Sequence, residues 1–110
     1  MDDEKMNEKK AAVSAWMQSH GWLVEEFRYE ERPMMYFWRS YDFRPIIITL
    51  WLTEEFFDDH SAFDIVHILE RLRAHEYLQS APKKFTIIRN SEAGTPEIIQ
   101  LTELPDGVSS

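Results

Sequence analysis

The sequence predicts an α+β domain, with an antiparallel sheet of about five strands and two helices in the order α-β-β-β-α-β-β. Two very apolar runs, 34–38 and 46–52, are joined by a short polar corner, which is typical of neighbouring strands. Two longer segments instead repeat their apolar residues at the spacing of a helix. Proline, glycine and charged residues lie between these segments and indicate turns.

The first helix is expected from about residue 4 to residue 20. Its apolar positions recur at spacings of three, four and seven residues, which places them on one stripe of a helix. Gly21 follows directly, and glycine suits the left-handed conformation that ends many helices. The stripe consists of Met6, Val13, Trp16, Met17 and His20.

Three strands follow the first helix. The segments 22–30, 34–41 and 46–52 are rich in aromatic and β-branched residues. Residues 30–33 form the first turn, because Pro33 cannot donate to a strand ladder, and residues 42–45 form the corner into the third strand. We therefore expect an antiparallel meander.

The middle strands are apolar on both faces. Alternation along the third strand puts Ile48 and Leu50 on one face but Ile47 and Trp51 on the other. A strand with one face in water would alternate apolar and polar residues instead. Two helices bury one face of a sheet, so we expect the second face to be left open for a partner.

A second helix is expected after the third strand. Ser61 followed by Asp64 resembles a capping pair, and the helix then runs to about residue 79, with Pro82 as its stop. The segments 84–90 and 97–103 are two further strands, joined by a hairpin loop that contains Gly94. We expect residues 1–104 to form a single domain and residues 105–110 to form a flexible tail. The buried stripe of the second helix consists of Phe63, Ile65 or Val66, Leu69, Leu72 and Tyr77.

Composition limits the function classes. The chain has 110 residues and no cysteine, so disulfides, thiolate metal sites and cysteine nucleophiles are excluded. The polar start MDDEKMNEKK lacks the apolar core of a secretory signal, and no apolar run is long enough to span a membrane, so we expect a cytoplasmic protein. The net charge of −8 disfavours duplex nucleic acid and favours a basic protein partner.

A candidate partner-binding surface combines an aromatic sheet face with an acidic segment. The segment 28–44 holds four arginines and no lysine among aromatic and methionine residues, a composition that is enriched at protein interfaces. The alternative is that the aromatic residues are core and the arginines extend from its edge. The segment 53–64 carries five acids and no base, and would steer a basic partner. The candidate residues are Met35, Phe37, Trp38, Arg39, Tyr41, Trp51, Glu54, Glu55, Asp58 and Asp59.

A metal-dependent enzyme is a further alternative. His60, Asp64 and His67 lie at i, i+4 and i+7, so a continuous helix would bring two imidazoles and a carboxylate to one face. The competing interpretation is the polar stripe of an amphipathic helix, and Arg71 one turn further on would repel a cation. The chain has only three glycines, no phosphate-binding loop and no nucleophile-elbow serine. We therefore expect a binding protein with no cofactor, and not an enzyme.

Four features carry a resemblance to a known family. The first helix ends in WMQSHGW, the meander follows, the second helix reads DIVHILERLRAHEYLQ, and the closing strands read KKFTIIRN and PEIIQLTEL. In this order, in size and in acidity the chain resembles the core of class I type III secretion chaperones, although the family's C-terminal helix has no counterpart after Leu104. The resemblance implies a homodimer that binds an extended protein segment along apolar surface.

A second group has comparable size and charge. It comprises small inhibitors, such as toxin immunity proteins and phage anti-defence proteins, which mask a basic site with acids. The sequence thus predicts a small acidic protein-binding module, chaperone-like or adaptor-like, with such an inhibitor as the alternative.

Overall fold

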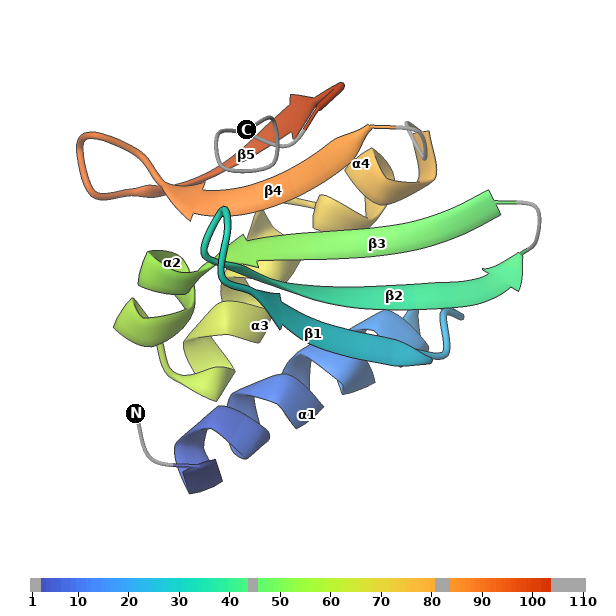
Figure 1. Cartoon of the computed structure of the whole chain (residues 1–110), viewed down its shortest axis with the longest axis horizontal. Helices are drawn as coiled ribbons and strands as arrows, with labels where there is room; N and C mark the ends of the chain where they lie inside the picture. The colour runs from blue at the N-terminus through green and yellow to red at the C-terminus, as the bar shows by residue number, and fades with distance from the viewer. Residues whose placement is uncertain (1–2, 44–45, 81–83, 104–110) are drawn as a thin grey trace.

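The computed structural model describes residues 3–43, 46–80 and 84–103, which form a mixed five-stranded sheet and four helices (Figure 1). The α+β class that the sequence predicts is confirmed. The elements in chain order are α1 (Asp3–Ser19), β1 (Glu26–Glu30), β2 (Met35–Phe43), β3 (Ile46–Thr53), α2 (Glu54–Asp59), α3 (Ala62–Arg71), α4 (Ala74–Ser80), β4 (Phe85–Asn90) and β5 (Pro96–Leu101).

The strands lie in the order β1-β2-β3-β4-β5. The predicted meander is confirmed, since β1, β2 and β3 pair antiparallel, and so is the closing hairpin of β4 and β5. The prediction of a wholly antiparallel sheet is wrong, because β4 pairs parallel to β3. Three helices connect these two strands as a crossover, and a crossover returns the chain to the same end of the sheet.

The prediction of two helices is also wrong. The first is confirmed as α1, with Gly21 at a φ of +90° just beyond its end. The second predicted helix is divided into α3 and α4. Helix α3 begins after Ser61, whose hydroxyl accepts from the backbone N–H of Asp64 as predicted. It ends before Arg73, whose φ of 56° is not helical. The acidic segment forms the extra helix α2, because the Thr53 hydroxyl caps it by accepting from the backbone N–H of Phe56.

Element ends differ from expectation in two places. The first strand begins at Glu26 and not at residue 22, because the backbone N–H of Trp22 donates to Met17 O and the chain still follows α1 there. The last strand ends at Leu101. Arg44 and Pro45 of the predicted corner, the predicted helix stop at Pro82 and the predicted tail 105–110 lie outside the described residues.

All four helices contribute to one core against one face of the sheet (Figure 1). Trp38 is fully buried there, and its indole N–H donates to Lys10 O of α1 over 3.2 Å. Large side chains of this core come from α1, α2, α3, β2, β3 and the loop after α1: Trp16, Met17, Phe56, Phe57, Leu69, Trp38, Leu50, Leu52 and Trp22. None of the helices in the described ranges is long and apolar enough to cross a membrane.

A second, smaller cluster lies on the opposite face of the sheet. We call it the outer cluster. It forms a row across the strands, because Phe37 pairs with Trp51, Trp51 with Ile87, and Ile87 with Ile99. Its buried members Met35, Phe37, Trp51 and Ile87 expose only 1–3% of their surface, and Phe85, Ile99 and Leu101 pack around them.

The expectation that this second face would be left open is therefore wrong for its centre. Side chains from four strands enclose one another there, and the Arg39 guanidinium lies over the Phe37 ring, 4.5 Å from its centroid. Trp51 contacts two further rings, with centroid distances of 4.8 Å to Phe37 and 5.9 Å to Phe85.

Candidate functional site

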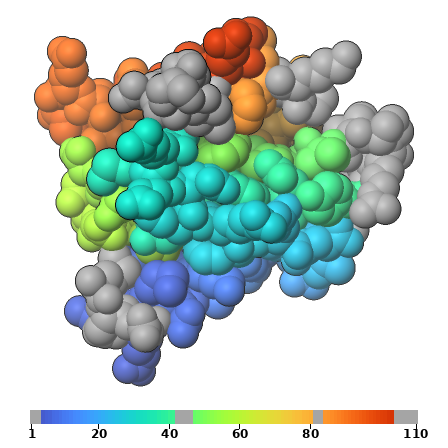
Figure 2. All heavy atoms as spheres, in the orientation of Figure 1, coloured from blue at the N-terminus to red at the C-terminus, as the bar shows by residue number. Residues whose placement is uncertain are grey.

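The helix α2 lies at one end of the sheet, beside the β1–β2 turn and the β4–β5 hairpin (Figures 1 and 2). Its first residue, Glu54, donates its backbone N–H to Met34 O over 3.0 Å. At its other end, the Asn90 amide donates to the Asp59 carboxylate over 2.9 Å. We call this region the acidic end and define it by Glu54, Glu55, Asp58, Asp59, Tyr29, Met34 and Tyr36.

The amphipathic pattern of α2 fixes which of its side chains face solvent. Phe56 and Phe57 are fully buried in the core between the helices and the sheet, which we call the main core, so the helix is anchored by its middle residues. Glu55, Asp58 and Asp59 are consequently exposed. Glu54 and Glu55 suit the first turn of a helix, whereas Asp58 and Asp59 lie in the last turn, where the backbone carbonyls disfavour acids. The stability of α2 itself therefore does not explain the two aspartates, although Asp59 also accepts from the Asn90 amide.

Two tyrosines extend the acidic end onto the sheet. The Tyr29 hydroxyl donates to the Glu54 carboxylate over 2.5 Å, and the Tyr29 and Tyr36 rings lie 4.8 Å apart. The bond to Glu54, followed by desolvation, raises the pKa of Tyr29 to about 12. Burial raises the pKa of Tyr36, and the charges of Asp58 and Glu54 raise it further. Both tyrosines therefore lie in a negative field.

The arginines and the α2 acids differ in how they are paired. Among the described residues, four arginines form ion pairs with carboxylates: Arg28 and Arg39 with Glu26, Arg73 with Glu76, and Arg89 with Glu97. No ion pair in this part of the chain includes a carboxylate of α2. The acids of α2 are therefore available to a partner, as are other acids outside these pairs, such as Glu30, Glu31 and Asp64.

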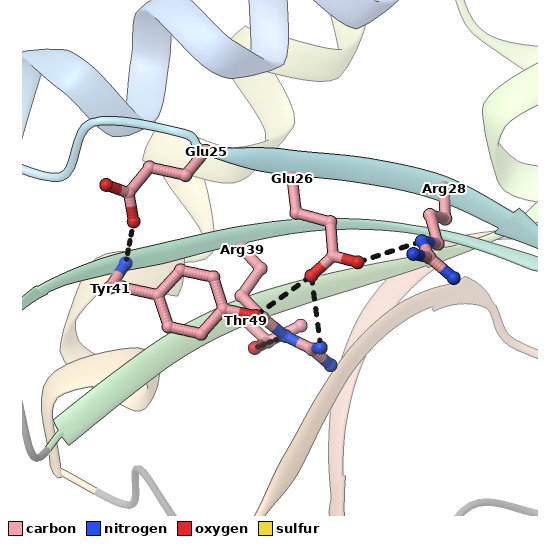
Figure 3. Close-up of polar contacts among 6 residues, drawn as sticks. All are labelled: Glu25, Glu26, Arg28, Arg39, Tyr41 and Thr49. Carbon is pink, nitrogen blue, oxygen red and sulfur yellow. Dashed lines mark hydrogen bonds and ion pairs between the residues drawn. The ribbon is translucent and has the colours of Figure 1, made fainter.

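Glu26 holds the polar edge of the outer face together (Figure 3). Its carboxylate accepts from the Tyr41 hydroxyl over 2.9 Å and pairs with Arg28 and Arg39 over 2.8 and 3.3 Å. Arg39 also donates from Nε to the Thr49 hydroxyl over 3.0 Å. Arg39 and Tyr41, both predicted to contact a partner, are thus engaged within the chain.

The structure separates the other predicted binding residues into three places. Trp38 lies in the main core under α1, on the opposite face from Phe37. Met35, Phe37 and Trp51 lie in the outer cluster. Glu54, Glu55, Asp58 and Asp59 come together on α2. Partner contact by any of them stays a prediction, but only the α2 group is presented to solvent.

A cavity of about 680 Å³ lies where α1 passes the junction of α2 and α3. Lys9 lines it, is 8% exposed, and donates from Nζ to Phe57 O over 2.8 Å while lying 5.2 Å from the Phe57 ring centroid. The ammonium therefore satisfies a carbonyl near the end of α2. The other lining residues are Lys5, Glu8, Asp58, Asp59, His60, Ser61 and Ala62.

The predicted metal stripe is not assembled. His60 lies between α2 and α3 with an extended backbone (φ −123°, ψ 146°), so helical spacing does not connect it to Asp64 and His67. Within the described ranges, one group of three or more histidine, aspartate and glutamate residues brings its donor atoms within 4.8 Å of one another. This group is His20, Glu70 and His75.

Sequence reasoning missed Tyr29 and Tyr36 as members of the acidic end. The signal was available only in part: Tyr29 and Tyr36 pair across β1 and β2, which follows once the turn fixes the register. Their contact with α2 depends on how the helix folds back over the β1–β2 turn, and no local pattern encodes that. His75, 55 positions after His20, likewise carried no local signal.

Fold and site together define an α+β domain with a mixed sheet, helices on one face and an acidic end. Comparisons of the chain with protein-family models, curated proteins and solved structures found no match. The resemblance to class I type III secretion chaperones therefore stays a prediction.

Proposed function

We propose that this protein is a small acidic protein-binding module, not an enzyme, and that its acidic end binds a basic surface of another protein. The observation that carries the proposal is the gathering of four carboxylates on one short helix, at Glu54, Glu55, Asp58 and Asp59. The arginines of Figure 3 are neutralised within the chain, whereas the carboxylates of α2 take part in no ion pair among the described residues. A cationic partner would supply the missing counter-charges.

The acidic end offers a lysine or arginine two kinds of contact. Carboxylates on α2 can accept charge-assisted hydrogen bonds, which are roughly twice as strong as neutral ones. The exposed rings and stems beside them, with Tyr29 40% and Met34 56% exposed, can pack against the aliphatic part of the same side chain. The net charge of −8 would add long-range attraction, mainly in the association rate.

Burial of the outer cluster supports an inhibitor-like mode over a chaperone-like one. A chaperone-like protein would bind an extended segment along apolar surface, yet the centre of this face is 1–3% exposed. An inhibitor such as an immunity or phage anti-defence protein needs accessible acids that mask a basic site, and α2 presents them. We therefore favour the masking of a basic site as the mechanism.

The test uses two variants that remove the same number of charges. Glu55→Gln/Asp58→Asn neutralises the acidic end, and Glu25→Gln/Glu103→Gln neutralises exposed acids before β1 and after β5. The partner is captured from the native host with the wild-type chain, purified, and titrated calorimetrically against all three proteins. We expect Kd to rise about tenfold for the first variant, on the order of 1.4 kcal/mol, and to be unchanged for the second.

Two outcomes would contradict the proposal. Equal weakening by both variants would mean that only net charge matters. The chaperone-like version would be favoured by two results together. Light scattering would show a homodimer that persists in the acidic-end variant, and this variant would bind the partner as tightly as the wild type. We expect a monomer alone and a 1:1 complex with the partner.

A further inference from the structure

Three helix ends meet at a cluster that the acidic end does not include. His20 directly follows α1, Glu70 lies in the last turn of α3, and His75 is the second residue of α4. The donor atoms of the three side chains all lie within 4.8 Å of one another. His20 Nε2 and Glu70 Oε1 are 3.7 Å apart.

One nitrogen of each imidazole in this cluster lacks a hydrogen-bond partner among the described residues. His20 Nε2 and His75 Nδ1 are buried atoms without a hydrogen-bond partner among the described residues. Trp16 Nε1 also lacks a partner there, and the Trp16 ring lies against the His20 ring with a centroid distance of 4.9 Å. Buried polar atoms nearly always have a partner, so each exception needs an explanation. Two such nitrogens beside one carboxylate form a set of metal ligands.

We infer that this cluster is a binding site for a divalent transition metal of the Zn²⁺ type, held by His20 Nε2, the Glu70 carboxylate and His75 Nδ1. Two imidazoles and one carboxylate are the protein ligands of one group of zinc sites that keep a fourth position open. Calcium and magnesium prefer oxygen ligands alone, so the nitrogens select against them.

The distances require only side-chain movement. In a tetrahedral site with metal–ligand bonds of about 2.1 Å, two ligand atoms are roughly 3.4 Å apart. The His20–Glu70 separation of 3.7 Å is close to that value. The His20 and His75 rings are stacked, with centroids 4.4 Å apart and planes at 11°, so their lone pairs lie in nearly parallel planes and do not converge on one point. Metal binding would therefore tilt the His75 ring out of the stack.

The surroundings favour a cation. The cluster lies at the carboxyl ends of α1 and α3, which carry partial negative charge, while His75 lies in the first turn of α4 at a positive helix end. Arg73, the nearest cation along the chain to His75, is paired with Glu76. Glu70 is half-exposed, which gives an ion a route from solvent. A bound ion would connect α1, α3 and α4 and so stabilise the folded chain.

The experiment titrates chelator-treated full-length protein with Zn²⁺ and with Co²⁺, with Mg²⁺ as the control ion. We expect one Zn²⁺ per chain with a micromolar or tighter Kd, a higher melting temperature, and the intense visible bands of four-coordinate Co²⁺. Glu70→Gln and His75→Ala should each weaken Zn²⁺ binding at least tenfold. Glu70→Gln changes a half-exposed side chain with little change in shape, so it keeps the test valid if His75→Ala unfolds.

The matched control is His67→Ala, which removes an exposed histidine outside the cluster and should bind Zn²⁺ as the wild type does. Histidine ring ¹⁵N spectra should show metal-induced shifts at His20 Nε2 and His75 Nδ1. The inference is overturned if the wild type does not bind Zn²⁺, if Glu70→Gln and His75→Ala bind it unchanged, or if His67→Ala loses it. None of these results bears on the acidic end, so the two proposals fail separately.

Discussion

Replacing Trp51 by alanine tests whether the outer cluster is a second core or a docking surface. Trp51 is 3% exposed and contacts the Phe37 and Phe85 rings. A buried tryptophan covers up to about 250 Å², which at about 25 cal/mol/Å² corresponds to an upper limit of roughly 6 kcal/mol. Measured losses for tryptophan-to-alanine changes in cores are about 3–5 kcal/mol, so we expect about 4 kcal/mol here.

The assay is urea unfolding followed by circular dichroism, together with a thermal melt. At about 4 °C per kcal/mol for a domain of this size, the melting temperature should fall by about 15 °C. Phe63→Ala is the control. The prediction that Phe63 lies in a buried stripe is wrong, because its side chain is 79% exposed, and its loss should cost less than about 0.5 kcal/mol. If Trp51→Ala cannot be purified folded, Trp51→Phe should still cost about 1–2 kcal/mol. A loss below about 1 kcal/mol for Trp51→Ala would refute the interpretation as a core.

Two further predictions concern polar contacts at and near the acidic end. Lys9→Met keeps most of the buried stem but removes the hydrogen bond from Nζ to Phe57 O, so it should lower the free energy of unfolding by about 2 kcal/mol. The control is Lys84→Met, which changes an exposed lysine and should leave the free energy of unfolding unchanged. Equal stability of the two variants would contradict this prediction. Because the pKa of Tyr29 is raised to about 12 in the folded chain, its contribution is complete below pH 10 and is lost between about pH 10 and 12. In Glu54→Gln, ultraviolet titration should show Tyr29 ionising near its ordinary pKa. In Tyr29→Phe, the loss of stability at alkaline pH should be smaller than in the wild type. An unchanged tyrosine titration in Glu54→Gln would show that the hydrogen bond does not set the pKa of Tyr29.

The elements that depend on local pattern could be predicted from the sequence. The stripe of α1, the cap at Ser61 and the antiparallel meander are each specified by residues close in the chain. The division of the second helix could not be predicted in this way, because the apolar spacing continues through Leu72. Arg73 takes a left-handed conformation that favours glycine, and nothing in its neighbours indicates it.

The sequence indicated only the part of the candidate site that lies in one short segment. Glu54, Glu55, Asp58 and Asp59 are adjacent in sequence, and their acidity was evident. The sheet face was not resolved to the same degree, because alternation separates Phe37 from Trp38 but does not say which of the two is covered by helices. The cluster of His20, Glu70 and His75 depends entirely on how three helix ends pack together.

The most direct test of the central claim is an amide and indole NMR titration of the labelled chain with its purified partner. The account predicts that the largest shift changes occur at residues 54–59 and at Tyr29 and Tyr36, while the indole signal of Trp51 stays in place. Shift changes confined to Trp51 and Phe37, with none in α2, would contradict the account and would show that the partner binds the outer sheet face.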